Sequence, residues 1–101
     1  MKYNKLVRDK IPEIIEASNK TCETEVVSGD TKYKYLENKL KEEVDEFIED
    51  KNLEELADIM EVLYALAEHL GYKEEDLMNK RKEKFNERGG FSKGIILKET
   101  K

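Results

Sequence analysis

Residues 53–70 constrain the fold most strongly, because their apolar side chains cover more than half of the circumference of a predicted helix. This apolar arc consists of Leu53, Leu56, Ala57, Ile59, Met60, Val62, Leu63, Tyr64, Leu66, Ala67 and Leu70. A helix with so wide an apolar surface has to be covered on more than one side. We therefore expect this helix at the centre of the fold. One thin bundle cannot cover the whole arc, which favours self-association.

Capping and helix-breaking residues predict three further helices. Asp9 and Asn52 are suitable N-caps, and Pro12 lies in the first turn of the helix that Asp9 would begin. Gly71 and Gly89 end the last two helices. The predicted helices cover about residues 10–18, 30–50, 52–71 and 73–88.

The predicted fold is all-α, a four-helix bundle-like single domain over residues 1–101. Residues 23–28 alternate weakly between apolar and polar, which is compatible with a strand-like or an irregular link, and the apolar run 94–97 is too short to assign. Charged residues make up 43% of the chain and hydrophobic residues 38%. A chain of this size buries only about 60–65% of its unfolded surface, so we expect a thin core.

Charge is distributed unevenly along the chain. Residues 37–76 contain fifteen acidic and four basic side chains, whereas residues 77–101 contain eight basic and three acidic ones. Solvated helix faces and the attraction between oppositely charged helices are one explanation of such blocks. The alternative is a metal-binding centre with a phosphate-binding rim. The net charge of −5 disfavours binding to a nucleic acid polymer, which requires a basic excess.

Membrane and secreted classes are not expected. The sequence has no apolar run near the roughly 20 residues that a membrane-spanning helix needs. The residues at its start lack the hydrophobic segment of a signal peptide. Cys22 is the single cysteine and has no partner for an internal disulfide. We therefore expect a cytoplasmic protein without a membrane partner.

Two pairs of carboxylates have the spacing of neighbours on a helix. Glu43 and Glu46 lie at the edge of an apolar stripe, while Glu55 falls inside the apolar arc and Asp58 at its margin. Residues three apart on a helix lie side by side, so each pair can aim both carboxylates at one point. A buried carboxylate must become protonated, pair with a cation or bind a metal. Two facing pairs would suit Mg²⁺ or Mn²⁺, and exposed acidic pairs are the simpler alternative.

The last predicted helix carries Arg81, Lys84 and Arg88 on one face. These side chains either lay their stems on the core and keep their charges in water, or bind phosphate oxygens. For the cations near the N-terminus a solvated segment and phosphate contact are equally compatible with the sequence. These cations are Lys5, Arg8 and Lys10.

Three segments resemble the MazG-like nucleoside triphosphate pyrophosphohydrolases, an all-α superfamily that includes phosphoribosyl-ATP pyrophosphohydrolases and dimeric dUTPases. The segments are KLKEEVDEF, EELADIMEVL and KFNERGGF. The family motif EExxE followed by ExxD is matched in order by Glu42, Glu43, Glu46, Glu55 and Asp58. The opening YNKLVRDKIPEII is similar to small phosphoribosyl-ATP pyrophosphohydrolase-like relatives. Residues 47–54 form a shorter connection between the motifs than many members have.

The resemblance implies a Mg²⁺-dependent enzyme, with Mn²⁺ as an alternative ion, held by Glu43, Glu46, Glu55 and Asp58. The substrate would be a nucleoside triphosphate or a related nucleotide such as phosphoribosyl-ATP, cleaved between its α- and β-phosphates to a monophosphate and pyrophosphate. Glu42 and Glu43 would be catalytic, and the three cations of the last helix would bind phosphate. A homodimer or homotetramer with a house-cleaning role is expected. A non-catalytic helical interaction or regulatory module is the alternative.

Overall fold

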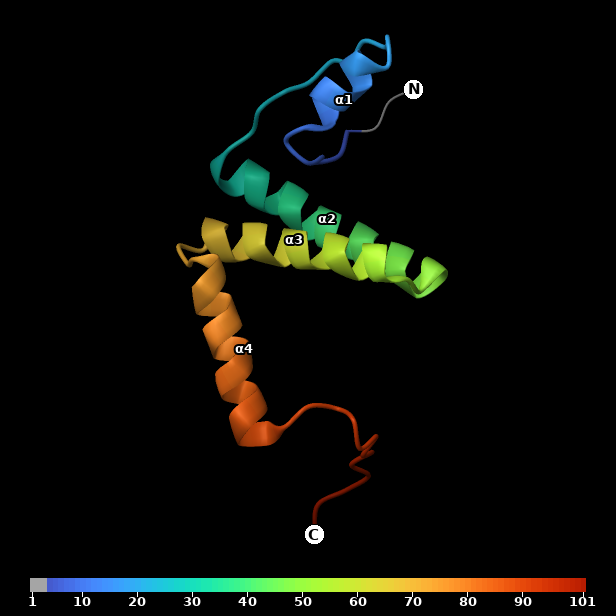
Figure 1. Cartoon of the computed structure of the whole chain (residues 1–101). Coiled ribbons are helices and arrows are strands. Elements are labelled where there is room, and N and C mark those ends of the chain that lie inside the picture. The colour runs from blue at the N-terminus through green and yellow to red at the C-terminus, as the bar shows by residue number, and fades with distance from the viewer. Residues whose placement is uncertain (1–3) are drawn as a thin grey trace.

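A computed structural model describes residues 4–101, and within this range the chain forms four α-helices (Figure 1). Their bounds are Ile11–Ala17 for α1, Gly29–Asp50 for α2, Leu53–His69 for α3 and Glu74–Arg88 for α4. The described residues contain no strand, so residues 23–28 and 94–97 are irregular. The predicted all-α class is confirmed. None of these helices has the length and apolarity to cross a membrane.

The two long helices α2 and α3 lie side by side and form a helical hairpin (Figure 1). Only residues 51–52 connect them. Lys51 adopts a left-handed conformation with φ of 53°, and Asn52 accepts a hydrogen bond from the backbone N–H of Glu55 at 2.9 Å. This bond confirms Asn52 as the N-cap of α3. The aromatic rings of Tyr33 and His69, with centroids 5.2 Å apart, join the two helices at the opposite end of the hairpin.

The core is small and lies inside the hairpin. Among the described residues the buried apolar side chains are Leu36, Val62 and Ala67, and Leu36 is only 2% exposed. Part of the apolar arc predicted for α3 is not covered. The exposed members of that arc include Leu53, Leu56, Met60 and Leu63. The prediction that α3 is sandwiched between neighbours is therefore only partly met by one chain.

The expected four-helix bundle does not close within one chain, and this part of the fold prediction needs correction. Among the described residues α4 packs against α3 alone, and the backbone of α1 approaches none of the other helices. The radius of gyration is 17.6 Å, whereas a compact chain of this length has about 13 Å. The physical reason is composition, because α4 is dominated by charged residues and α1 has only seven residues to bury.

The junction between α3 and α4 is fixed by a few local contacts. The Tyr64 hydroxyl donates a hydrogen bond to the Met78 sulfur at 3.2 Å, and Asp76 accepts one from the backbone N–H of Lys73 at 2.8 Å. From this junction α4 extends away from the hairpin (Figure 1). It ends at Arg88, where Gly89 has a φ of 77°, as the sequence predicted.

The start of the first helix differs from the prediction by one residue. Lys10 is the N-cap of α1, and its side chain makes no capping hydrogen bond. Asp9 was expected in that position and lies outside the helix. Pro12 does lie in the first turn, where its missing N–H leaves no helical hydrogen bond unmade.

Candidate metal centre

Three carboxylates meet where α2 and α3 face each other near the hairpin turn. Glu43, Glu55 and Asp58 each offer one oxygen atom, and these three atoms lie within 4.8 Å of one another. We call these three residues the acidic centre. The Asn52 cap fixes the first turn of α3, which contains Glu55, and Asp58 follows about one turn later on the same side. The tight turn thus brings carboxylates from two helices together.

Glu43 is the buried member of the acidic centre. Its exposed fraction is 6%, and one carboxylate oxygen lies 3.1 Å from the Lys39 ammonium. The other oxygen, Oε2, is buried and has no hydrogen-bond partner among the described residues, and the same holds for Oε2 of Glu55. Buried polar atoms without a partner are rare, because the loss of hydration is not compensated. Carboxylate oxygens are the ligands that hard divalent cations take.

The shifted pKa values at the site indicate that the clustered carboxylates favour a nearby positive charge. Burial and the negative charges of neighbouring carboxylates, first among them Glu46, raise the pKa of the Glu55 carboxyl above its usual value. Burial and the carboxylate of Glu43 likewise raise the pKa of Glu46. Each shift shows that the protein disfavours another negative charge here. A bound divalent cation would reverse that preference.

The four predicted metal ligands do not take equivalent positions. Glu43, Glu55 and Asp58 converge, whereas Glu46 is half-buried one turn along α2 and is not among the three oxygens that meet. The spacing of three residues correctly indicated neighbours on each helix. Which of them reach one point depends on how α2 and α3 pack against each other.

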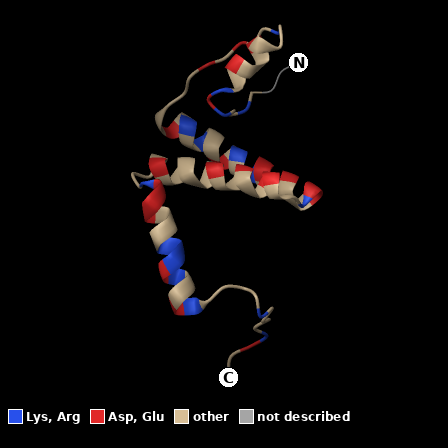
Figure 2. Ribbon diagram, in the orientation of Figure 1, with Lys and Arg blue, Asp and Glu red and all other residues tan. Residues whose placement is uncertain are grey.

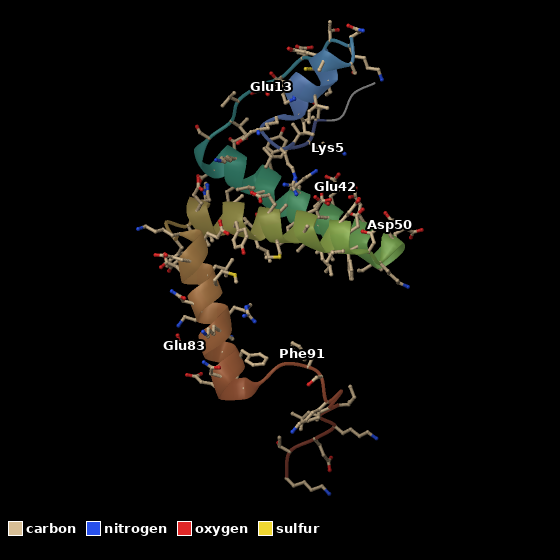
Figure 3. All side chains as sticks on the ribbon, in the orientation of Figure 1. Lys5, Glu13, Glu42, Asp50, Glu83 and Phe91 are labelled. Carbon is tan, nitrogen blue, oxygen red and sulfur yellow. The ribbon has the colours of Figure 1, made fainter. Side chains whose placement is uncertain are left out.

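Glu42 faces the N-terminal cations instead of the acidic centre. Its carboxylate accepts a hydrogen bond from Lys5 at 3.0 Å and lies 3.5 Å from the Lys39 ammonium (Figure 3). Burial of Glu42 acts to raise its pKa, but the hydrogen bond from Lys5 and the charge of Lys39 outweigh burial, so the pKa lies below its usual value. The structure thus shows Glu42 as a charged ion-pair partner, and its catalytic role stays a prediction.

The segment before α1 supplies an unexpected part of the site. The Arg8 guanidinium donates a hydrogen bond to Oδ1 of Asp58 at 2.7 Å, and its other terminal nitrogen lies 4.0 Å from Glu61. The sequence alone does not assign a role to Arg8 or Lys5, since no helical periodicity links them to partners 50 and 37 positions later. The basic character of the segment before α1 was the one sequence feature that indicated a contact with acidic groups. Lys10 makes no ion pair within the described structure.

The three predicted phosphate-binding cations lie elsewhere. Arg81, Lys84 and Arg88 are exposed on α4, and Figure 2 shows this helix running away from the acidic hairpin. Because α4 begins at the end of α3 opposite to the acidic centre, one chain does not bring these cations to the carboxylates. Their role in phosphate binding stays a prediction.

A surface hollow of about 650 Å³ lies at the junction of α3 and α4. Its lining includes Ala67, Tyr72, Leu77 and Lys80, and it contains no residue of the acidic centre. This hollow is therefore a different feature of the surface from the candidate metal centre.

Comparison of the chain with protein-family models, with curated proteins and with solved structures gave no match.

Proposed function

We propose that this chain is a Mg²⁺-dependent nucleotide pyrophosphohydrolase of the MazG-like type. It would cleave the α,β-phosphoanhydride of a nucleoside triphosphate or related nucleotide, such as phosphoribosyl-ATP, to a monophosphate and pyrophosphate. The observation that carries the proposal is Glu43, a buried residue with an unpartnered carboxylate oxygen, whose carboxylate belongs to the same cluster as those of Glu55 and Asp58. The order and spacing of the acidic motifs support the same family.

The residues of the acidic centre fit a hard divalent cation. Glu43, Glu55 and Asp58 would hold it, with Glu46 as an adjacent fourth carboxylate, and Mn²⁺ takes the same oxygen ligands. When bound, such an ion neutralises phosphate oxygens and lowers the pKa of a coordinated water. Lys39 fixes the carboxylate of Glu43 through their ion pair, so this ligand is held in place before the ion arrives.

The reaction itself is a hydrolysis at the α-phosphorus. The attacking water gives up a proton to the surrounding solvent as its oxygen forms a bond to that phosphorus, the bond to the bridging oxygen breaks, and pyrophosphate leaves with the electron pair. The cations of this chain would stabilise the charge that gathers on the leaving group, because fixed positive groups act most strongly where charge develops.

A second copy of the chain is the expected partner. The uncovered face of α3 carries Leu53, Leu56, Met60 and Leu63, and the radius of gyration exceeds that of a compact chain. An isologous contact would pair this face with itself and bury it on both subunits. A dimer, or a tetramer built from two dimers, would also offer α4 cations from one subunit to the acidic centre of another.

Product analysis tests the proposed reaction. A panel of nucleoside triphosphates, deoxynucleotides and phosphoribosyl-ATP is incubated with Mg²⁺, and pyrophosphate and orthophosphate are quantified separately. We expect pyrophosphate release that is lost in Glu55→Gln and kept in Glu54→Gln, an exposed acid next to it in α3. Orthophosphate without pyrophosphate, or equal turnover by both variants, would contradict the assignment. Faster turnover of non-standard nucleotides would support a house-cleaning role.

The exposed apolar face also favours a second candidate, a non-catalytic helical interaction or regulatory module. In that case the acidic side chains keep the protein in solution and bind no ion. The two candidates differ in their response to divalent cations, because only the hydrolase needs the acidic centre to bind one. A metal-independent melting temperature together with no turnover would favour the interaction module.

A further inference from the structure

The N-terminal segment lies beside α2, with Lys5 close to Glu42 (Figure 3). Arg8 is bonded to Asp58 at 2.7 Å, and Lys5 is bonded to Glu42 at 3.0 Å. These contacts connect the start of the chain to both helices that carry the carboxylates. Two positive charges therefore lie next to a cluster that would hold a metal ion.

The side chains of both cations are partly exposed. Their side chains are 51% exposed for Arg8 and 43% for Lys5, in contrast to 17% for Lys39, which is turned into the hairpin. A guanidinium has five N–H donors in a planar fork, so the bond to Asp58 leaves other donors able to reach a second acceptor. The geometry of that fork matches two oxygens of one phosphate group.

The carboxylate that holds Arg8 is itself a candidate metal ligand. Once Asp58 shares its charge with a divalent cation, its attraction for the guanidinium weakens, while the phosphate groups of a nucleotide bring several negative charges to the same place. Exposed ion pairs contribute little to stability, so exchange of this partner is easy. We propose that Arg8, with Lys5 beside it, binds the substrate phosphates at the acidic centre, and that Asp58 is the partner of Arg8 only while substrate is absent.

This inference rests on the proposed pyrophosphohydrolase function and names the phosphate-binding residues of that same site. It differs from the expectation for Arg81, Lys84 and Arg88, which α4 carries away from the hairpin (Figure 2). The N-terminal cations need no second subunit to reach the carboxylates. A single chain therefore contains both the carboxylates that would bind the metal and the cations that would bind the phosphates.

Two binding measurements on the full chain test the proposal. Calorimetry determines the affinity for Mn²⁺ alone and then for inorganic pyrophosphate at saturating Mn²⁺. Loss of a charge-assisted hydrogen bond in Arg8→Gln should weaken pyrophosphate binding about tenfold to hundredfold. Its Mn²⁺ affinity should equal or exceed that of the wild type, because a competing cation has left Asp58. Arg8→Lys keeps the positive charge but lacks the planar guanidinium. Its affinity for pyrophosphate should lie between those of the wild type and Arg8→Gln.

Lys10→Gln is the matched control, since Lys10 lies in the same segment, loses the same charge and makes no ion pair within the described structure. It should leave both affinities unchanged. Equal pyrophosphate affinities for Arg8→Gln and Lys10→Gln would overturn the inference. A parallel loss of Mn²⁺ and pyrophosphate affinity in Arg8→Gln would also overturn it, because Arg8 would then only hold the segment in place. A wild-type protein that binds no Mn²⁺ would refute the proposed function itself.

Discussion

Replacement of Glu43 by Gln is the most direct test of the acidic centre. Glu43 is 6% exposed, and its carboxylate belongs to the three that lie within 4.8 Å of one another. Glutamine has almost the same shape, so the packing between α2 and α3 is kept while one anionic ligand is removed. Glu49→Gln is the matched control, because Glu49 is an exposed residue of the same helix outside the acidic centre.

The expected size of the effect follows from mass action. At a metal concentration one hundred times the dissociation constant, binding stabilises the folded state by about 2.7 kcal/mol. For 101 residues, an unfolding entropy of about 2.1 cal/mol/K per residue converts this to a rise in melting temperature of about 13 °C. Removal of a ligand should weaken affinity by about a hundredfold or more, since changes outside the ligand shell already cost about 10- to 100-fold. The rise then shrinks to about 2 °C.

Thermal melts followed by circular dichroism provide the measurement. Each variant is melted in chelator and in MgCl₂ or MnCl₂, and only the difference within one variant is compared. This comparison cancels any change in metal-free stability, including the loss of the 3.1 Å ion pair between Lys39 and Glu43. An equal metal-induced rise in the wild type, Glu43→Gln and Glu49→Gln would refute the assignment of Glu43 as a ligand.

Three further changes test the fold and the assembly. Leu36→Ala removes the most deeply buried side chain, which is 2% exposed, and should lower the free energy of unfolding by about 2–5 kcal/mol in urea titrations; a loss well below this range would mean that the core lies elsewhere. Asn52→Ala removes the 2.9 Å capping bond to the Glu55 N–H and should cost about 1 kcal/mol in the same titration, while an unchanged midpoint would exclude a capping contribution. The double change Leu56→Glu and Leu63→Glu places charges on the uncovered face of α3 and should reduce the mass measured by sedimentation equilibrium to that of one chain. A wild-type mass already equal to one chain would rule out the second copy.

Helix positions were largely predictable because the rules that set them act over a few residues. Asn52 caps the N-terminus of α3, Pro12 lies in the first turn of α1, and Gly89 follows the last residue of α4, as the sequence indicated. The prediction of Asp9 as the N-cap of α1 was wrong by one position, because Lys10 is the N-cap. Such boundaries depend on backbone conformations that particular residues favour or exclude.

The candidate site was predictable only in part. The spacing of three residues identified carboxylates that are neighbours on one helix, but the convergence of Glu43 with Glu55 and Asp58 depends on how α2 packs against α3. The charge pattern shows that the first residues are basic, but it does not show which carboxylates they contact. The bond from Arg8 to Asp58 spans 50 residues, a separation over which no periodic pattern carries information.

The all-α class, the helix boundaries and the pairing of acidic residues along each helix follow from local sequence, because caps, glycines and side-chain periodicity act within one or two turns. Tertiary packing alone determines that three carboxylates meet, that Arg8 lies on one of them and that α4 extends away from the hairpin. These features arise from the relative placement of whole elements. That placement depends on the sum of many weak contacts between distant residues, and here it leaves an apolar face of α3 uncovered.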